Sequence, residues 1–193
     1  MADVTVVIPT IPPRAWMLER AVRSVEAQTR PPTNVIIELD ESGAGACATR
    51  NRGLSKVTTE WVAFLDDDDE LLPNHLEDLG NVAAVTGADL VYPRWEGANV
   101  NLFNGLIGYA FDARLREHIR SANFIPITTL VRTKLLHDVG GFSPHPDTSP
   151  TNPCEDWGAW LKLLDAGAKF VHYPEVTWRW NGHGGHTSGR SWK

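Results

Sequence analysis

Four consecutive aspartates, Asp66–Asp69, follow an apolar run at residues 61–65 and precede Glu70. Adjacent carboxylates repel one another, so packing them at the end of a buried strand is unfavourable unless a cation neutralises them. A hard divalent ion suits such a group, and an enzymatic Mg²⁺ or Mn²⁺ combines one or two protein carboxylates with phosphates and water. The alternative is a solvated turn whose acids stabilise the dipole of the next helix, a role that fits Asp69 and Glu70. The position after a buried strand favours the cation site for Asp66–Asp68.

A second acidic pair, Glu155-Asp156, begins an amphipathic segment in which Trp157, Trp160 and Leu161 have core spacing. A carboxylate held at the mouth of a helix can act as a general base. Acids in the first helical turn also favour the helix dipole without any catalytic role. The local pattern leaves both interpretations open.

The segment at residues 178–188 combines aromatic, glycine and histidine residues. Trp178 and Trp180 alternate on one strand and therefore share a face, which either lines a sugar site or belongs to the core. His183 and His186 lie among glycines, which allow close approach to a ligand. Their spacing of three is not a zinc signature, and an exposed histidine is more often inert than a metal ligand.

Two arginines, Arg50 and Arg52, occur on a short helical segment after the second apolar run. Each can balance the acidic block or contact phosphate, whereas a simple surface charge is the alternative, favoured for Arg52. The sequence has no GxGxxG, P-loop, GxSxG or HExxH motif. Their absence argues against dinucleotide oxidoreductases, P-loop kinases, serine hydrolases and zinc proteases.

The elements that must position these residues alternate along the first half of the chain. Apolar runs predict strands at residues 4–8, 34–39, 61–65 and 89–92, with helices at about 14–28, 46–55 and 73–84 between them. Such βα units of about 30 residues predict a parallel α/β sheet, with ligands at the carboxyl ends of the strands. We therefore expect Pro9-Thr10, Asp40 and Asp66–Asp69 to share one edge of the sheet.

The second half of the chain is less regular. Residues 96–123 form an excursion rich in Gly and Asn, and residues 143–153 form a proline-rich loop. Strands are predicted at 127–132, 169–173 and 176–180, and helices at 133–139 and 155–165. Because no linker divides the chain, residues 1–193 are expected to form a single domain.

Composition narrows the class of protein. The 193 residues are 42% hydrophobic and 22% charged, which indicates a globular domain, and the net charge of −6 with no basic run argues against nucleic-acid binding. Two cysteines, Cys47 and Cys154, do not make a disulfide framework. No apolar run approaches the roughly 20 residues of a membrane span, and the N-terminus enters a strand at once. A cytoplasmic protein is therefore expected.

Taken in order, these segments resemble family 2 of the inverting nucleotide-sugar glycosyltransferases, over most of the chain from about Val4 to Ser188. Residues 6–10 resemble the family's opening strand, and Arg50-Asn51-x-Gly53 resembles its Arg-Asn-x-Gly helix. Residues 64–69 resemble the Asp-x-Asp metal site. The remaining matches are the Gly-Gly-Phe turn at 140–142, the Glu-Asp pair at 155–156 and the histidine region at 183–188.

The resemblance implies a GT-A fold: an α/β domain with a Rossmann-like, mostly parallel sheet flanked by helices. Its nucleotide-binding half would span about 1–95 and its acceptor-side half about 96–193. It further implies Asp156 as the catalytic base, and Asp68 with His183 as ligands of Mn²⁺ or Mg²⁺. The residues implied for the nucleotide-sugar, UDP-linked by family habit, are Pro9, Thr10, Asp40, Arg50, Asp66, Asp67, Trp178 and Trp180. The sugar stays open, as does the acceptor hydroxyl, which a glycan, protein, lipid or small molecule can supply.

Two alternative functions have to be compared with this one. A sugar-phosphate nucleotidyltransferase normally carries a glycine-rich loop with Arg and Lys after its first strand, whereas residues 10–14 contain no glycine. A non-catalytic binder of nucleotides or carbohydrates is the other alternative. The retained acids Asp66, Asp68 and Asp156 argue against a binder without proving turnover.

Overall fold

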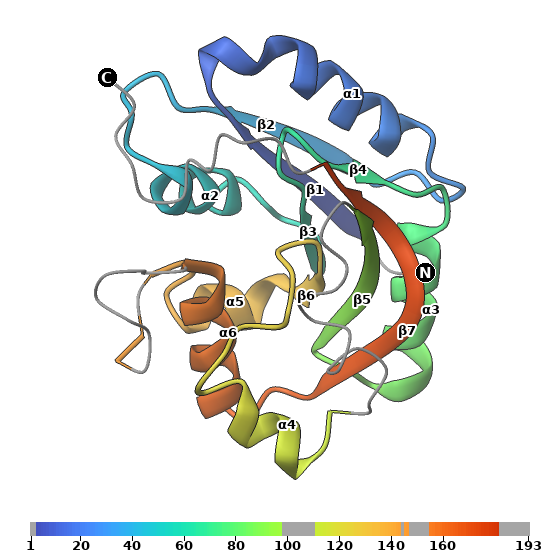
Figure 1. The fold of residues 1–193 in the computed structure, drawn as a ribbon, viewed down its shortest axis with the longest axis vertical. Coiled ribbons are helices and arrows are strands. Elements are labelled where there is room, and N and C mark those ends of the chain that lie inside the picture. The colour runs from blue at the N-terminus through green and yellow to red at the C-terminus, as the bar shows by residue number, and fades with distance from the viewer. Residues whose placement is uncertain (1–2, 98–110, 144, 147–154, 182–193) are drawn as a thin grey trace.

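The computed structural model describes residues 3–97, 111–143, 145–146 and 155–181, and it forms an α/β domain around one seven-stranded sheet (Figure 1). The strands lie in the order β2-β1-β3-β6-β5-β7-β4. Their bounds are β1 Val4–Thr10, β2 Asn34–Leu39, β3 Trp61–Phe64, β4 Glu70–Leu71, β5 Leu90–Gly97, β6 Leu130–Arg132 and β7 Phe170–Trp180. The helices are η1 Pro12–Arg14, α1 Ala15–Glu26, α2 Ala46–Leu54, α3 His75–Thr86, α4 Ala113–His118, α5 Thr133–Asp138 and α6 Glu155–Asp165.

The sheet is mixed in direction. Strand β1 pairs in parallel with β2 and β3, as the alternating βα units predict, and β5 pairs in parallel with β7. Strand β6 runs antiparallel to both β3 and β5, and β4 runs antiparallel to β7. The prediction of parallel pairing from alternating βα units therefore holds for β1, β2 and β3. It does not extend to β6, which follows the long excursion and runs antiparallel to both of its neighbours.

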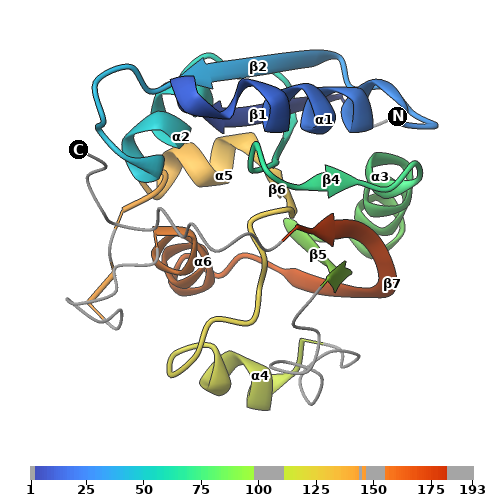
Figure 2. The same cartoon turned by 45° about the horizontal axis from the view of Figure 1, so that its top comes forward.

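Helices cover both faces of the sheet, and each face has its own apolar core (Figures 1 and 2). On one face, Ala21 and Val25 of α1 and Leu79 of α3 pack against the strands. On the other face, Leu54 of α2 and Trp160 of α6 share a core with the strands. The carboxyl ends of β1, β2 and β3 therefore emerge between two layers of helices.

Local sequence explains where the helices begin and end. The prolines of η1 occupy the first turn before α1, where a missing N–H costs nothing. Glu77 and Asp78 lie in the first turn of α3, and Gly87 ends that helix in the left-handed conformation with φ +67°. Asp112 caps α4 by accepting a hydrogen bond from the Leu115 N–H.

The predicted elements agree with the structure in the first half of the chain and less well in the second. Strand β2 and helix α6 have the predicted bounds. The two strands predicted at 169–173 and 176–180 are one strand, β7, because a bulge opposite Pro93–Trp95 absorbs the break. Helix α4 and the two-residue strand β4 were not predicted. Most of the proline-rich loop, and residues 98–110 of the excursion, lie outside the described residues.

A buried histidine makes the fold sensitive to acid. His75 is fully buried at the start of α3, where Nδ1 lies 2.9 Å from Thr177 Oγ1 of β7. Burial lowers the pKa of His75 from 6.5 to about 3, so the folded state holds the ring neutral whereas the unfolded state protonates it near pH 6.5. This contribution to stability is present above pH 6.5 and is lost as the pH falls from 6.5 towards 3.

We therefore expect urea unfolding to show a free energy that falls by roughly 1 kcal/mol per pH unit below 6.5 on account of His75. His75→Asn should be less stable at pH 7 yet show a shallower loss on acidification. His137→Asn, on the exposed surface of α5, serves as the control. An acid slope in His75→Asn equal to that of the unaltered protein would contradict this assignment.

Candidate active site

The acidic block forms a compact group at the carboxyl end of β3. Asp66, Asp68 and Asp69 each place a carboxylate oxygen within 4.8 Å of the others. Burial, together with the charge of Asp66, raises the pKa of Asp69 from 3.8 to about 8, so this carboxyl is neutral at pH 7 unless a cation joins the group. Three converging carboxylates, one of them with a raised pKa, fit a hard divalent cation, and a cation site in this block was predicted from the sequence.

The fourth aspartate of the block points elsewhere. Asp67 is buried and accepts a hydrogen bond of 2.7 Å from Thr10 Oγ1 at the end of β1. It also pairs with Arg14 at 2.8 Å, and this arginine reaches Asp68 at 3.3 Å. The predicted meeting of Thr10 with the acidic block at one sheet edge is thus confirmed, and Asp67 holds the block in place. Asp69, rather than Asp67, joins Asp66 and Asp68 in the carboxylate triad.

Three arginines surround the triad. Arg50 of α2 donates to Asp66 at 2.6 Å and is itself buried. Arg20 of α1 donates to the backbone oxygen of Asp68 at 2.6 Å and lies 3.3 Å from the Glu70 carboxylate. With Arg14, these side chains place positive charge beside the triad, where an anionic ligand such as a diphosphate would lie. Arg50 was predicted from the sequence, whereas Arg14 and Arg20 carry no signal there that separates them from surface arginines.

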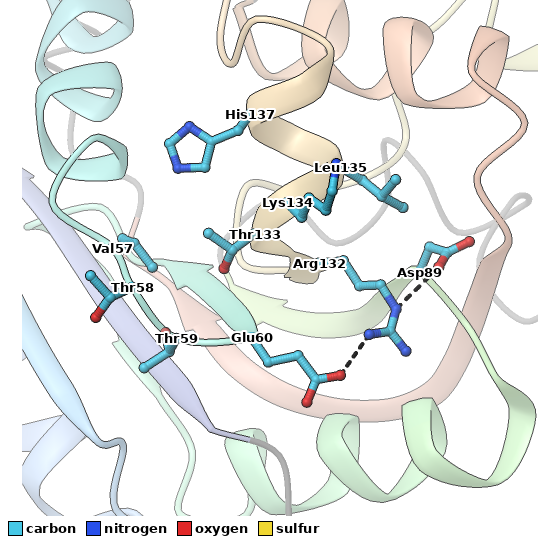
Figure 3. Close-up of a pocket in the computed structure, with 10 residues that line it drawn as sticks. All are labelled: Val57, Thr58, Thr59, Glu60, Asp89, Arg132, Thr133, Lys134, Leu135 and His137. Atoms are coloured by element: carbon cyan, nitrogen blue, oxygen red, sulfur yellow. Dashed lines mark hydrogen bonds and ion pairs between the residues drawn. The ribbon is translucent and has the colours of Figure 1, made fainter.

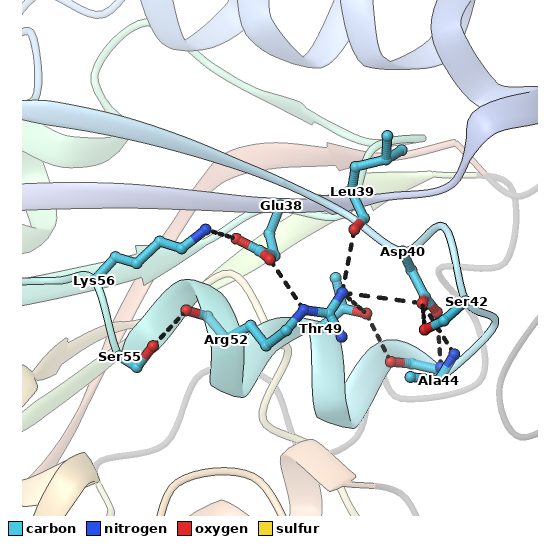
Figure 4. A network of polar contacts seen from close by, with 10 residues as sticks. Glu38, Leu39, Asp40, Ser42, Ala44, Thr49, Arg52, Ser55 and Lys56 are labelled. Carbon is cyan, nitrogen blue, oxygen red and sulfur yellow. Dashed lines mark hydrogen bonds and ion pairs between the residues drawn. The ribbon is translucent and has the colours of Figure 1, made fainter.

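At the end of β2, Asp40 organises a loop (Figure 4). Its buried carboxylate accepts hydrogen bonds from the Ala44 N–H at 2.9 Å and the Gly45 N–H at 2.7 Å. Ser42 donates to the same group at 3.2 Å, and the hydrogen bonds of this loop lower the pKa of Asp40 against the opposing effect of burial. Asp40 therefore shapes the loop before α2 with an ionised carboxylate.

Next to Asp40, Glu38 is buried between two cations (Figure 4). Arg52 donates to the Glu38 carboxylate at 3.0 Å, and Lys56 pairs with its second oxygen. Hydrogen bonds from both partners lower the pKa of Glu38 against the opposing effect of burial. Arg52 therefore pairs with Glu38 rather than balancing the charge of the acidic block.

Of the two tryptophans of β7, Trp178 belongs to the core and Trp180 lies at its margin. Trp178 is 5% exposed and packs against Trp95, with ring centroids 5.9 Å apart. Trp180 is half-buried and packs against the same apolar cluster. The structure thus favours the core interpretation over the sugar-site interpretation for Trp178. His183 lies outside the described residues, although the preceding Asn181 donates its N–H to Asp69 at 2.9 Å.

Asp156 lies in the first turn of α6 and is partly exposed. One carboxylate oxygen accepts the Trp157 N–H at 2.7 Å, and the other accepts from the Asn123 side chain at 3.3 Å. Trp157 in turn donates its indole N–H to the Ile119 carbonyl at 2.6 Å, which fixes the start of the helix. Helix α6 therefore presents a positioned carboxylate, and its partner Asn123 has no recognisable signal in the sequence.

A pair of hydrogen bonds, here called the clamp, joins Asn51 of α2 to Phe142 in the turn that follows α5. The Asn51 side chain donates to the Phe142 carbonyl at 2.7 Å and accepts the Phe142 N–H at 2.8 Å. Gly141 approaches so closely, with φ +63°, that a Cβ there would lie 2.4 Å from Asn51 Oδ1. Phe142 is fully buried and packs at 6.2 Å against Trp160 of α6, so the clamp fixes α6 relative to the helix that carries Arg50.

Asn51→Ala should lower the free energy of unfolding by about 1–3 kcal/mol, because the buried Phe142 N–H is left without its partner. The Phe142 carbonyl keeps a hydrogen bond from Cys47, which limits the loss. Urea unfolding measures the change, with Asn81→Ala on the exposed face of α3 as the matched control. Equal stability of the two variants would show that the clamp contributes nothing.

A separate pocket of about 620 Å³ lies where β3 begins and β6 ends, at the sheet edge opposite to that of the triad (Figure 3). Its Arg132 is held between Glu60 at 2.6 Å and Asp89 at 3.2 Å, and stacks on the ring of Trp61. These pairs neutralise Arg132, and the lining Lys134 pairs with Asp138, so neither cation is offered uncompensated to a nucleotide. The triad, at the other edge of the sheet, is the stronger candidate site.

Comparison with known proteins identifies the family. The model of "Glycosyl transferase family 2" matches residues 36–143, which contain the triad, the clamp and Arg50. The chain belongs to glycosyl transferase family 2. Within the described ranges, no helix combines the length and apolar character that crossing a membrane requires.

Individual relatives agree with this family. The "Pre-mycofactocin glycosyltransferase" of Mycobacterium tuberculosis is 33% identical over 141 residues, which are 67% of this chain and 28% of that protein. The "Uncharacterized glycosyltransferase YibD" of Escherichia coli is 40% identical over 52 residues, 27% of this chain and 15% of that protein. The chain thus spans less than a third of the length of these curated relatives.

A solved structure shares the fold. The crystal structure of Staphylococcus aureus TarS 1-349 in complex with UDP-GlcNAc matches with a TM-score of 0.77 and 16% sequence identity. The match covers 99% of this chain and 62% of that chain. The GT-A architecture expected from the sequence is therefore confirmed, with a sheet of mixed direction.

Proposed function

We propose that this family 2 protein transfers a sugar from a nucleotide-sugar to an acceptor hydroxyl, with inversion at the anomeric carbon. The observation that carries the proposal is the triad of Asp66, Asp68 and Asp69 beside Arg14 and Arg50, at the carboxyl end of the parallel strands. That edge is where α/β sheets bind ligands. Asp156, on a helix joined to α2 by the clamp, supports the assignment of a base.

For the donor we propose a nucleoside diphosphate sugar, with uridine favoured because the TarS complex contains UDP-GlcNAc. Asp68 and Asp66 would hold Mn²⁺ or Mg²⁺, with Asp69 as a third carboxylate and His183 as a further ligand. Such an ion supplies charge that stabilises the leaving diphosphate. Arg14 and Arg50 lie within 3.3 Å of triad carboxylates, close enough to exchange those partners for phosphate oxygens.

The base and ribose would lie over the ends of β1 and β2. Pro9 and Thr10 end β1 there, and the Asp40 carboxylate holds the loop at 41–45 that borders the same edge. Asp40 is buried, so we propose that it acts on the nucleotide mainly through that loop. Trp180, half-buried at the end of β7, stays a candidate contact for the sugar.

On the acceptor side we propose that Asp156 removes the hydroxyl proton as the oxygen attacks the anomeric carbon. General bases of this kind contribute about 10²–10⁴ in rate. The hydrogen bonds from Trp157 and Asn123 orient its two oxygens. Glu155, the neighbouring acid in the first turn, keeps a supporting role in this proposal.

A panel of nucleotide-sugars tests the function. Thermal unfolding with and without Mn²⁺ should show one nucleotide-sugar that stabilises the protein by about 2.7 kcal/mol at a hundredfold excess over Kd. The same donor should be hydrolysed slowly without an acceptor, which a non-catalytic binder would not do. Stabilisation without turnover would indicate a non-catalytic binding protein instead of an enzyme. No response to any nucleotide-sugar would refute the proposal.

A further inference from the structure

Strand β2 is an edge of the sheet with an apolar face. Of the strands that the structure describes, β1 alone pairs with β2, and β2 lies along one margin of the molecule (Figure 2). Val35, Ile37 and Leu39 are 42%, 47% and 42% exposed. An open edge of this kind is a template for pairing with another strand, and proteins usually protect it with charge. The exposed face of β2 has no charged residue.

The three exposed side chains share the face that α1 covers on the neighbouring strand. Val35 is the register partner of Val6, and Ile37 is the partner of Ile8. Val6 and Ile8 are fully buried in the core that includes α1, whereas the β2 residues beside them are not covered. On the opposite face, Glu38 is occupied by Arg52 and Lys56, so no uncompensated acid faces a partner there.

We propose that two copies of this chain pair antiparallel through their β2 edges, about a two-fold axis at Ile37. Asp40 donates its N–H to Thr10 of β1, and the register pairs Asn34 with Thr5. The even-numbered residues of β2 therefore direct their backbone groups to β1, and Val35, Ile37 and Leu39 direct theirs to the open edge. Pairing about Ile37 sets Val35 opposite Leu39 of the partner as a hydrogen-bonded pair. It sets Ile37 opposite itself as the central hydrogen-bonded pair, with Cα atoms about 5.5 Å apart.

This register places each exposed aliphatic side chain of β2 opposite an exposed aliphatic side chain of the partner. Val35 lies opposite Leu39 of the partner, so six aliphatic side chains form one continuous row across the two-fold axis. An isologous contact of this kind closes on itself and leaves no further edge of β2 to extend. Registers displaced by two residues leave at least one aliphatic side chain of each copy without an apolar neighbour.

Charge also favours the antiparallel arrangement of two copies. Arg30 precedes β2, whereas the exposed Glu41 follows it. Antiparallel pairing brings the basic end of each strand towards the acidic end of the other, whereas parallel pairing brings like charges together. A six-residue strand buries less than the roughly 800 Å² per partner of a standard interface. The dimer should therefore dissociate on dilution.

Sedimentation over a range of concentrations tests the dimer, and substitutions test the surface. We expect a concentration-dependent dimer whose dissociation constant rises at least about tenfold in Ile37→Lys, because like charges then oppose each other at the axis. Val85→Lys, at an exposed valine of α3, is the matched control and should leave the constant unchanged. A monomer at every concentration up to about 1 mM would overturn the proposal.

Cross-linking tests the register. In a Cys47→Ser, Cys154→Ser background, Ile37→Cys should form a disulfide dimer under mild oxidation, because its own copy lies opposite at the axis. Ile36→Cys and Val85→Cys should not do so at the same rate. A dimer that cross-links equally through Val85→Cys, or that Ile37→Lys does not weaken, would place the interface elsewhere. Open-ended oligomers would likewise overturn a closed two-fold contact.

Discussion

Asp68→Asn should abolish the Mn²⁺-dependent part of UDP binding while leaving the protein folded. The substitution keeps the shape of the side chain but removes one of three carboxylate charges whose oxygens lie within 4.8 Å of one another. Loss of an outer-shell partner already costs about 10–100-fold in metal affinity, so loss of a ligand charge should cost more. Calorimetric titration of UDP with and without Mn²⁺ measures the effect.

The stability of the metal-free variant adds an independent readout. The charge of Asp68 contributes to the raised pKa of Asp69, so its removal relieves repulsion in the block. Metal-free Asp68→Asn should therefore be at least as stable as the unaltered protein. Asp67→Ala should behave in the opposite way, because it removes the buried partner of Thr10 and Arg14. Asp138→Asn, an exposed acid on α5, is the control, and unchanged Mn²⁺-dependent binding in Asp68→Asn would refute the cation site.

The sheet edge could be predicted from the sequence because strand ends have local signals. Apolar β-branched runs set the ends of β1, β2 and β3, and parallel pairing then brings those ends together. The contact of Thr10 with Asp67 follows from that pairing. The prediction rested on strand direction alone, and it weakened in the second half, where β6 reverses the direction of the sheet.

The roles within the acidic block could not be predicted in the same way. Four adjacent aspartates look alike in a sequence, and the turn after β3 decides which carboxylates converge. It directs Asp67 towards Thr10 and Arg14, whereas the buried Asp69 joins Asp66 and Asp68. The helix-capping role expected for Asp69 is replaced by a hydrogen bond from the Asn181 N–H.

Tertiary packing also decided the roles of the aromatic and amide side chains. The alternation of Trp178 and Trp180 is typical of a ligand-binding face and of a buried face alike. The two interpretations are distinguished only by the packing of Trp95 against Trp178 and by the neighbouring core. Asn51 was known only as part of the Arg-Asn-x-Gly segment. Its two hydrogen bonds to Phe142 join residues 91 positions apart, which no local pattern reveals.

Asp156→Asn should reduce sugar transfer by about 10²–10⁴ while leaving donor affinity nearly unchanged. The asparagine has the same shape and can still accept the Trp157 N–H, so the start of α6 should keep its geometry. It cannot accept a proton from the acceptor hydroxyl, so the effect falls on the rate. Asp165→Asn at the other end of α6, where the acid pairs with Arg120 and His145, is the matched control.

The measurement pairs a rate with a binding constant for each variant. Donor hydrolysis gives the rate before an acceptor is known, because water replaces the hydroxyl as the nucleophile, and calorimetry gives the donor Kd. A near-normal rate in Asp156→Asn would exclude Asp156 as the base. An equal collapse of donor affinity would reassign the residue to donor binding. The role of a base on the acceptor side predicts a slow rate with an unchanged donor Kd in Asp156→Asn and a normal rate in Asp165→Asn. An unchanged Kd means that the fold and the donor site are both intact, so the lost rate is then assigned to the base.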